Sequence, residues 1–494
     1  MKREDLLSKI SDPSKVWDVV VIGGGATGLG VAVDAVTRGY SVALFEWEDF
    51  AKATSSRSTK LVHGGVRYLA QGDVSLVLEA LYERGLLQQN APHLVKNQSF
   101  LIPNYRYWDN FLYTVGLTIY DILAGRLSLG RSKYVSKKKT TSYLPTVRVD
   151  GLKGGVVYHD GQFDDSRLAV NLAQSCVENG GCPINRMKVT AILHGSDGRA
   201  RGVKVQDLMN GQEYEVKAKA VINATGIFVD SIMEMDVPTH EHMVKPSQGV
   251  HLVLDKSFLQ SDYAIMIPKT DDGRVLFAVP WHDKVVVGTT DTLREHPELE
   301  PQALESEIEF ILNTAGRYLT RKPQRSDVLS VFAGLRPLAA PKKEGKSTKE
   351  ISRSHKIFVS ENKLITITGG KWTTYRRMAE DTVDKAIELN LLEKKACVTK
   401  KFRIHGYQLN PDLNNHLYIY GSDIQAIKTL MQSDPAMAEK LHPKYDYTVA
   451  EVVWAVREEM ALNVEDILAR RVRLLFLDAR VAAEVAPKVA RIVA

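Results

Sequence analysis

The sequence predicts an α/β fold in three parts: a discontinuous parallel-sheet domain, an antiparallel β-sheet domain and a C-terminal helical domain. First, the apolar run 19–22 meets a glycine cluster and then helix-forming residues, the pattern of a strand, a tight turn and a helix. Second, β-rich runs between residues 245 and 292 are broken by Asp-Asp-Gly and His-Asp turns, which indicates an antiparallel sheet. Third, apolar residues recur at helical spacing beyond residue 394. At 494 residues, the chain is long enough for two or three such domains.

The composition excludes several classes of protein. The net charge of +6 is modest and dispersed, and no basic-aromatic recognition module is present, so we expect no nucleic acid partner. The three cysteines form neither a disulfide framework nor a metal-type spacing, so we expect no metal site. The polar start of the chain lacks a secretory signal, and no apolar stretch reaches the roughly 18 to 20 residues that span a bilayer. We therefore expect a globular protein on the cytoplasmic side, able to lie on a membrane.

The stretch VVVIGGGATGLGVA, residues 19–32, carries the pattern G-x-G-x-x-G at Gly23, Gly25 and Gly28. In this pattern the first glycine permits the turn, the second lets the backbone approach a pyrophosphate, and the third lets the helix pack on the strand. A second apolar strand follows and is closed by Glu46, 18 residues after Gly28, where a carboxylate accepts hydrogen bonds from an adenosine ribose. The sequence therefore predicts a Rossmann-like unit that binds an adenine dinucleotide.

Three further segments favour FAD over NAD as that dinucleotide. Residues 48–69 form a polar, glycine-containing loop where a nicotinamide dehydrogenase continues with its next strand or helix. An apolar strand ends at Ala224, Thr225 and Gly226, whose small side chains leave room beside a nucleotide. Gly369 and Gly370 open a later helix, whose amide dipoles suit an electron-rich group such as the flavin pyrimidine carbonyl. The nucleotide-binding domain is therefore expected to be discontinuous.

Five motifs follow one another within residues 16 to 390: TSSRSTKLVHGGVRYL, NATGIFVD, VGTTDT, FAGLRPL and TGGKWTTYRRMAED. Together they resemble the FAD-dependent glycerol-3-phosphate dehydrogenases of the aerobic respiratory type, and the later stretch EEMALNVEDILARRVRLLFLD is similar to the C-terminal helical domain of that family. The resemblance implies a D-amino-acid-oxidase/glutathione-reductase-type FAD domain with a substrate, or cap, domain. We expect residues 16–95, 155–244 and 354–392 to form the FAD domain, 96–154 and 245–353 the cap domain, and 393–494 the helical domain.

The resemblance also implies a reaction, the oxidation of sn-glycerol 3-phosphate to dihydroxyacetone phosphate with hydride transfer from C2 to flavin N5. Such a reaction needs cations for the phosphate, and Arg336 stands out because it lies in an apolar setting where an unpaired charge is costly. By resemblance Arg67, Arg336, Arg353 and Lys371 belong to the substrate pocket. Tyr68 is assigned to the same pocket, where it either donates a hydroxyl hydrogen bond to the substrate or packs under the flavin ring. The predicted cofactor contacts are Gly23, Gly25, Gly28, Glu46, Thr54, Ser55, Ser56, Thr59, Leu61, His63, Gly64, Gly65, Ala224, Thr225, Gly226, Gly370, Lys371 and Thr373.

Two histidines are candidates to accept the hydroxyl proton of the substrate, because a neutral imidazole takes up a proton near neutral pH. His63 adjoins two glycines that permit close approach to a ligand, whereas His251 lies in an apolar run that equally suits a core position. The choice between them stays open, and Arg336 and Lys371 complete the predicted catalytic set. Gly288–Thr292 is either a substrate contact or a polar turn.

Residues 105–139 combine aromatic residues, an apolar face and a basic end. They are either an interfacial helix pair attracted to anionic lipid or a cap-domain helix with its apolar face in the core, and the second reading is slightly favoured. The resemblance implies a membrane quinone as electron acceptor and a peripheral location on the inner face of the cell membrane. The alternatives are a glycerol-3-phosphate oxidase that uses O₂ and another flavoenzyme of the D-amino-acid-oxidase-like group. Homodimerisation stays open.

Overall fold

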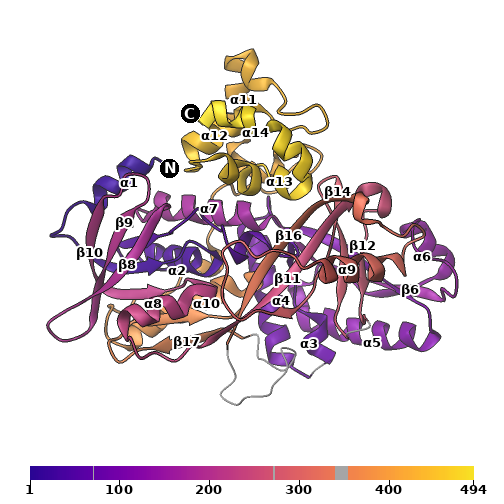
Figure 1. Cartoon of the computed structure of the whole chain (residues 1–494). Coiled ribbons are helices and arrows are strands. Elements are labelled where there is room, and N and C mark those ends of the chain that lie inside the picture. Colours follow the sequence, from indigo (N-terminus) through magenta and orange to yellow (C-terminus); the bar gives the residue numbers. More distant parts are fainter. Residues whose placement is uncertain (71, 271–272, 340–353, 494) are drawn as a thin grey trace.

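The computed structural model describes residues 1–70, 72–270, 273–339 and 354–493. A domain around a mixed sheet with a parallel centre lies on the left of Figure 1, a mainly antiparallel sheet on the right, and the C-terminal helices above both. This architecture confirms the predicted α/β class with a separate antiparallel sheet and a C-terminal helical domain.

The first sheet has eight strands in the order β17-β18-β10-β1-β2-β7, with the β8–β9 hairpin joined to β10. Strand β1 pairs in parallel with both β10 and β2, which places the end of β1 at the centre of the sheet. The strands are β1 (Val16–Ile22), β2 (Val42–Phe45), β7 (Cys182–Ile184), β8 (Met187–His194), β9 (Ala200–Asp207), β10 (Glu213–Asn223), β17 (Lys356–Val359) and β18 (Ile365–Thr368). Its helices are α1 (Arg3–Ile10), α2 (Ala26–Thr37), α7 (Asp165–Glu178), α8 (Val229–Asp236) and α10 (Tyr375–Glu388).

The second sheet has ten strands, and its long pair β11·β16 runs antiparallel. The strands are β3 (Leu61–Val62), β4 (Lys96–Asn104), β5 (Lys133–Ser136), β6 (Gly154–Gln162), β11 (Val244–Asp255), β12 (Ala264–Ile267), β13 (Leu276–Trp281), β14 (Lys284–Gly288), β15 (Thr292–Leu293) and β16 (Val328–Ala339). Its helices are α3 (Val66–Ala70), α4 (Val74–Asn90), α5 (Tyr107–Ala124), α6 (Lys137–Tyr143) and α9 (Glu305–Gly316).

Two strands belong to the ten-stranded sheet, although the domain boundaries proposed above assign their residues to the FAD domain. β6 pairs with β4 and β3 in the ten-stranded sheet, although residues 155–162 and 61–62 were assigned to the FAD domain. Residues 297–320 carry helical spacing in the sequence, but α9 covers only Glu305–Gly316. Pro297 and Pro301 precede it, and proline lacks the backbone N–H that a helix interior needs.

The C-terminal helices share a core with the antiparallel sheet. They are α11 (Ile424–Ser433), α12 (Val449–Glu458), α13 (Leu474–Leu477) and α14 (Ala479–Val493), with a π-helical turn over Asp466–Arg471. Buried residues of this domain, among them Phe476 and Leu477, pack in one cluster with Trp281 and Phe332 of the sheet. The domain therefore rests directly on the strands that approach the site described below.

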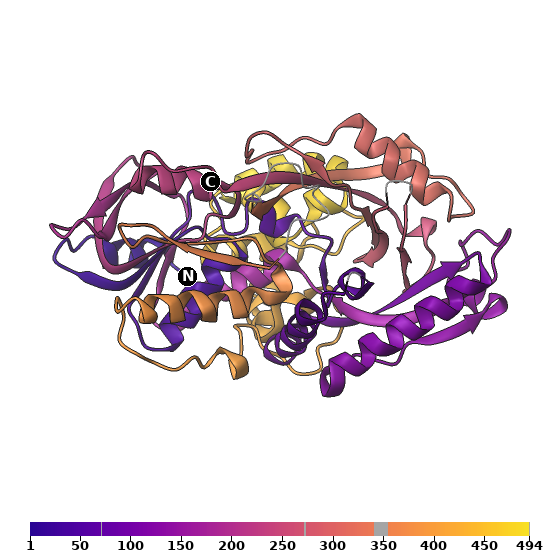
Figure 2. The same ribbon diagram turned by 90° about the horizontal axis from the view of Figure 1, so that it is seen from below.

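Helix α5 lies on the outer surface of the molecule beside the ten-stranded sheet (Figure 2). The slightly favoured reading, in which its apolar face is in the core, is wrong for most of that face, because Trp108, Phe111 and Ile122 are 60–70% exposed. Only Asn110, Leu117, Tyr120 and Ala124 of this helix are buried. None of the helices in the described part of the chain is long and apolar enough to cross a membrane.

Candidate active site

The glycine turn after β1 leaves the start of α2 open to a ligand. Gly23 has φ +107°, a left-handed value that side chains disfavour, and Gly25 directly precedes the helix. A Cβ on Gly28 would lie 1.9 Å from the Gly23 carbonyl oxygen, so this position accepts only glycine while the turn and the helix stay packed. The first N–H groups of α2 have no partner within the helix, which makes this end a site for an anion such as a pyrophosphate.

Glu46 follows β2 and lies against this turn. Its Oε2 accepts a hydrogen bond of 2.6 Å from the Gly24 amide, and its Oε1 accepts one of 2.8 Å from the Glu48 amide. Burial raises the pKa of Glu46 to about 7, although the two amide donors oppose the shift. A hydroxyl donor such as a ribose would restore its preference for the charged form.

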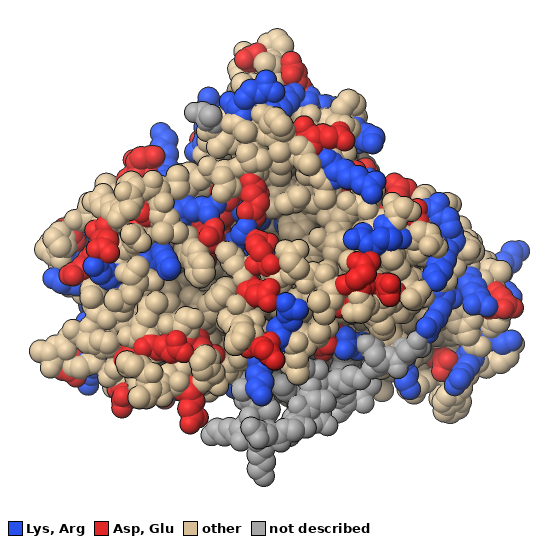
Figure 3. Space-filling view, viewed as in Figure 1, with Lys and Arg blue, Asp and Glu red and all other residues tan. Residues whose placement is uncertain are grey.

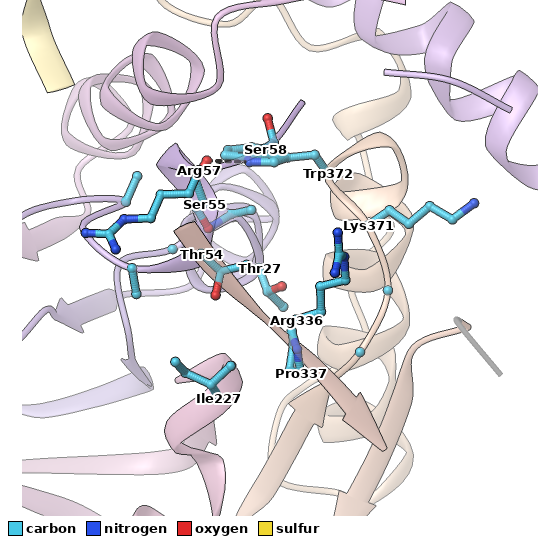
Figure 4. A pocket seen from close by; sticks show the side chains of 18 of the residues that line it. Thr27, Thr54, Ser55, Arg57, Ser58, Ile227, Arg336, Pro337, Lys371 and Trp372 are labelled. Atoms are coloured by element: carbon cyan, nitrogen blue, oxygen red, sulfur yellow. Dashed lines mark hydrogen bonds between the residues drawn. The ribbon is translucent and has the colours of Figure 1, made fainter. Parts of the chain in front are cut away.

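A cavity of ≈ 670 Å³ begins at this turn and extends between the two sheets. Figure 4 shows side chains around it from the start of α2 (Thr27), from segment 54–58, from the turn before α8 (Ile227), from β16 (Arg336) and from residues 371–372. Its size is in the range of cofactor sites in proteins. The cavity therefore joins the glycine turn of one sheet to Arg336 on β16 of the other.

Segment 54–63 lines the cavity and is hydrogen-bonded to elements of both sheet domains. The Thr54 hydroxyl donates to the Leu335 carbonyl of β16 at 2.6 Å, and the Ala26 amide donates to Ser55 Oγ at 2.9 Å. The Trp372 indole donates to the Ser55 carbonyl at 2.8 Å, and the His63 amide donates to Thr373 Oγ1 at 3.2 Å. The motif at residues 368–374 therefore holds this segment as well as lining the cavity.

Two cationic side chains reach the cavity from different elements. Arg336 Nη2 donates to Thr289 Oγ1 at 3.1 Å, and its Nη1 lies 3.6 Å from Asp291 Oδ1. Lys371 Nζ lies 4.2 Å from the centroid of the Tyr68 ring. A guanidinium and an ammonium on one wall suit a phosphate oxyanion.

The two candidate histidines have different surroundings. His251 is 2% exposed, stacks on Phe332 with 4.9 Å between ring centroids, and its Nε2 lies 2.8 Å from Thr59 Oγ1. Burial, with the Lys60 and Arg336 cations, lowers the pKa of His251 well below its ordinary value. His63 is half-buried and lines the cavity beside the Gly64–Gly65 turn, so both imidazoles are at the cavity wall.

The structure brings most of the predicted residues to this cavity. Lining it are Gly23, Gly25, Glu46, Thr54, Ser55, Thr59, Leu61, His63, Gly65, Tyr68, Ala224, Thr225, Gly226, His251, Arg336, Gly370, Lys371 and Thr373. Ser56, Gly28 and Gly64 lie behind the wall: Ser56 is 1% exposed, and the Gly28 and Gly64 backbones pack on Gly23 and Tyr120. Arg67 lies in α3. Arg353 lies outside the described residues.

Sequence reasoning missed several lining residues. Thr27 and Trp372 lie inside motifs that were recognised, so their position next to the glycines was the available signal. Asp291 and Thr289 belong to the turn whose role was left open, and their contacts with Arg336 place this turn at the cavity. Arg57 lines the cavity and donates to the Ala333 carbonyl, a contact across 276 residues that carries no local signal.

Comparison with known proteins finds relatives along the entire chain. A family of FAD-dependent oxidoreductases matches residues 18–376, and the C-terminal domain of alpha-glycerophosphate oxidase matches residues 361–494. The mitochondrial glycerol-3-phosphate dehydrogenase of Schizosaccharomyces pombe is 40% identical, over 97% of this chain and 84% of that protein. The mitochondrial glycerol-3-phosphate dehydrogenase of Homo sapiens is 38% identical, over 99% of this chain and 71% of that protein.

Solved structures agree with these matches. The glycerol-3-phosphate dehydrogenase from Bacillus halodurans, complexed with FAD, has a TM-score of 0.78 and 30% identity, with 98% of this chain and 90% of that chain covered. The L-alpha-glycerophosphate oxidase from Mycoplasma pneumoniae with FAD bound has a TM-score of 0.60 and 18% identity, with 80% and 99% covered, and supports the fold alone.

Proposed function

Since this chain belongs to the family of FAD-dependent glycerol-3-phosphate dehydrogenases, we propose that it oxidises sn-glycerol 3-phosphate to dihydroxyacetone phosphate and passes the electrons to a membrane quinone. The observation that carries the proposal is the cavity, which joins the nucleotide turn at Gly23 to Arg336 and Lys371. A glycerol phosphate needs this combination, because its phosphate requires cations while its carbinol must face the electron acceptor.

The described residues fit FAD as the bound cofactor. The Gly23–Gly28 turn provides a backbone cradle for the pyrophosphate, and the carboxylate of Glu46 lies beside it with capacity for a further hydroxyl donor. When bound, FAD supplies the acceptor for the hydride that leaves C2 of the substrate. The protein's own task is to bind the phosphate, orient C2 and accept the hydroxyl proton.

Arg336 and Lys371 hold the substrate phosphate in this proposal. Asp291 lies 3.6 Å from the Arg336 guanidinium and keeps it at the cavity, and the Thr289 hydroxyl accepts from the same side chain. Hydrogen bonds to charged groups contribute about 1.5–3 kcal/mol each, which corresponds to roughly 10- to 100-fold in affinity. Loss of Arg336 should therefore act mainly on substrate binding.

His63 is the proton acceptor that we favour. A proton on His251 would be destabilised by burial and by two nearby cations, and its Nε2 is already bonded to Thr59. His63 lines the same cavity and is half-buried, so its imidazolium loses less hydration. His251 then stays neutral and forms part of the cavity wall, where it is hydrogen-bonded to Thr59.

The direct test is anaerobic addition of sn-glycerol 3-phosphate to the purified holoenzyme, followed by flavin absorbance. We expect bleaching by this substrate and not by glycerol, which lacks the phosphate. Arg336→Met should raise the substrate concentration for half-maximal bleaching roughly 10- to 100-fold, whereas Arg325→Met, a matched change at a half-exposed surface arginine, should not. A holoenzyme that keeps its yellow colour with substrate present would refute the proposed reaction.

The histidine assignment is tested in the same assay. His63→Asn should slow flavin reduction by about 100-fold, the scale of a lost general base, and His251→Asn should have the smaller effect. The reverse order would assign the proton to His251.

The membrane part of the proposal rests on α5. Its exposed residues Trp108, Phe111, Leu112, Val115, Ile119 and Ile122 recur at helical spacing and form one apolar stripe. Neighbouring α4 exposes Val74, Leu78 and Tyr82 in the same way. Apolar stripes of this kind on a soluble surface mark an interaction site.

The basic residues near α5 favour a lipid surface with anionic headgroups as the partner of this apolar stripe. Lys137, Lys138 and Lys139 are exposed at the start of α6, and Lys133 is exposed on β5, which contacts α5. Lys and Arg side chains gather at the right edge of Figure 3, where α6 lies. Aromatic residues beside a basic cluster are typical of a helix that lies in an anionic membrane interface. We therefore propose a peripheral position on the inner face of the cell membrane.

Vesicle flotation tests this surface. The protein should float with vesicles that contain phosphatidylglycerol and much less with pure phosphatidylcholine. Phe111→Ser combined with Ile122→Ser should abolish flotation, whereas the control pair Leu409→Ser and Leu413→Ser, which is equally exposed elsewhere, should not. Equal binding by both double variants would contradict α5 as the membrane surface.

The acceptor is tested by reoxidation of the substrate-reduced enzyme. Rapid reoxidation by a ubiquinone analogue, with slow reoxidation by air, is expected for the proposed dehydrogenase. Rapid reoxidation by air with stoichiometric peroxide would instead identify an oxidase.

A further inference from the structure

The C-terminal domain contributes no side chain to the described cavity wall, whose residues extend from Ile22 to Met378. It nevertheless contacts the back of segment 54–63, the segment that carries Thr54, Thr59 and His63 to the cavity. Two residues of the segment face away from the cavity and into this contact. Ser56 is 1% exposed and Lys60 is fully buried, with a left-handed φ of +63° that is uncommon for a long side chain.

Asp165, the first residue of α7, is the anchor behind the segment. Its Oδ2 accepts hydrogen bonds from the Ser58 amide at 3.1 Å, from the Ser58 hydroxyl at 2.6 Å and from Lys60 Nζ at 2.7 Å. Lys60 Nζ also donates to the Ser56 carbonyl at 2.7 Å. One carboxylate oxygen thereby fixes both residues that flank Thr59.

Arg473 of the C-terminal domain holds this anchor from the other side. Its Nη2 donates to Asp165 Oδ1 at 3.0 Å and to the Ser56 carbonyl at 3.1 Å. The side chain is 1% exposed, and its own φ of +62° is also left-handed. A buried cation with a shared carboxylate is strongly coupled to its partners, because removal of one charge leaves the others uncompensated.

A second contact runs through aromatic rings. Phe476, three residues after Arg473, packs edge-on against Phe332 with 4.9 Å between centroids, and Phe332 stacks on His251 at 4.9 Å. Lys60 Nζ lies 5.1 Å from the Phe332 centroid and 5.5 Å from that of Phe476. The C-terminal domain therefore touches the supports of both candidate histidines.

We propose that Arg473 is a positioning residue for the oxidation reaction: with Asp165 and Lys60 it fixes the backbone of segment 54–63, so that the C-terminal domain is a functional part of the active site. This inference rests on the proposed function for its kinetic consequence. Its structural consequence, an ordered segment 54–63, does not depend on the identity of the substrate.

The experiment compares Arg473→Met with Arg473→Lys and with a matched control in the holoenzyme. The control is Arg3→Met at another buried arginine, whose hydrogen bonds within the described residues go to Asp207, to the Asn185 carbonyl and to Met187, and to no residue of segment 54–63. We measure FAD content, stability in urea, the limiting rate of anaerobic flavin reduction, and hydrogen exchange of residues 54–63.

Arg473→Met should lower the limiting rate of flavin reduction at least about tenfold, because small misplacements of reacting groups act on the rate. The protein should retain FAD, and the substrate concentration that gives half the limiting rate should change less. Hydrogen exchange in 54–63 should rise. Arg473→Lys should recover part of the rate, since it retains the charge, and Arg3→Met should lose stability but keep both the rate and the exchange pattern. Phe476→Leu offers a milder probe of the same contact if Arg473→Met does not fold.

Two results would overturn the inference: a wild-type rate and exchange pattern in folded Arg473→Met, or the same losses in Arg3→Met. A wild-type enzyme that is not bleached by sn-glycerol 3-phosphate would overturn the proposed function instead. In that case hydrogen exchange alone decides whether Arg473 orders the segment.

Discussion

Glu46 should make FAD binding depend on pH. The Glu46 side chain is half-buried, and its loss of hydration raises its pKa in the free protein to about 7 from an ordinary 4.5. A ribose hydroxyl that donates to this carboxylate favours its charged form and lowers the pKa in the complex. The free protein then holds more protons than the complex below pH 7, so FAD affinity should fall as pH falls. A complete return to the ordinary pKa would weaken Kd by roughly 30-fold between pH 8 and pH 5.5, or about 2 kcal/mol.

Titration of deflavinated protein with FAD, followed by quenching of flavin fluorescence, measures this effect from about pH 8 to about pH 5.5. Glu46→Gln keeps the size of the side chain and removes the titration, so its Kd should be weaker at pH 8 and nearly independent of pH. Glu234→Gln, an exposed glutamate on α8, is the control and should keep the wild-type slope. A wild-type Kd that is constant across this range, or an unchanged slope in Glu46→Gln, would refute the reasoning.

Two further predictions concern the nucleotide turn and the C-terminal domain. Gly28→Val should purify without flavin, because its Cβ would lie 1.9 Å from the Gly23 carbonyl oxygen. The control Gly116→Ala, whose Cβ would have nothing within 4 Å, should keep full flavin absorbance. A yellow Gly28→Val protein would contradict the tight turn. His405 bridges Asp423 and Glu178, and these carboxylates outweigh burial and raise the pKa of His405 to about 9 from 6.5. The contribution of His405 to the free energy of unfolding is on the order of 1–3 kcal/mol, because Glu178 is half-exposed. This contribution should be complete below pH 6.5 and lost as pH rises through 9. In urea unfolding, His405→Gln should therefore match the wild type only at high pH.

The nucleotide turn was predictable because its determinants are local. Gly23, Gly25, Gly28 and Glu46 lie within one strand, turn, helix and strand, and each has a role that follows from backbone geometry. The glycine pair after β18 was recognisable for the same reason. Such motifs predicted the cofactor class, and most of the residues that they assigned to the site line the cavity.

The supports of the site were not predictable in this way. Asp165 lies 105 residues from Lys60, and Arg473 lies 308 residues from Asp165, so no periodicity or spacing relates them. The exposure of α5 was the less favoured of two readings for a different reason, since an amphipathic pattern shows that a helix has an apolar face and does not show what covers it. Both features depend on which surfaces the fold brings together.

The position of α3 relates the cavity to the proposed membrane surface. This short helix contacts α4 and α5, whose exposed apolar residues form that surface, and it carries Tyr68, which lies at the cavity beside Lys371. A quinone that stays among the lipid chains would therefore approach the protein next to the substrate end of the cavity, while sn-glycerol 3-phosphate, being charged, must enter from water. In the proposed membrane-bound position, the basic cluster at α6 and the apolar stripe on α5 would together orient this end of the cavity toward the bilayer interface, where both proposed reactants would be available.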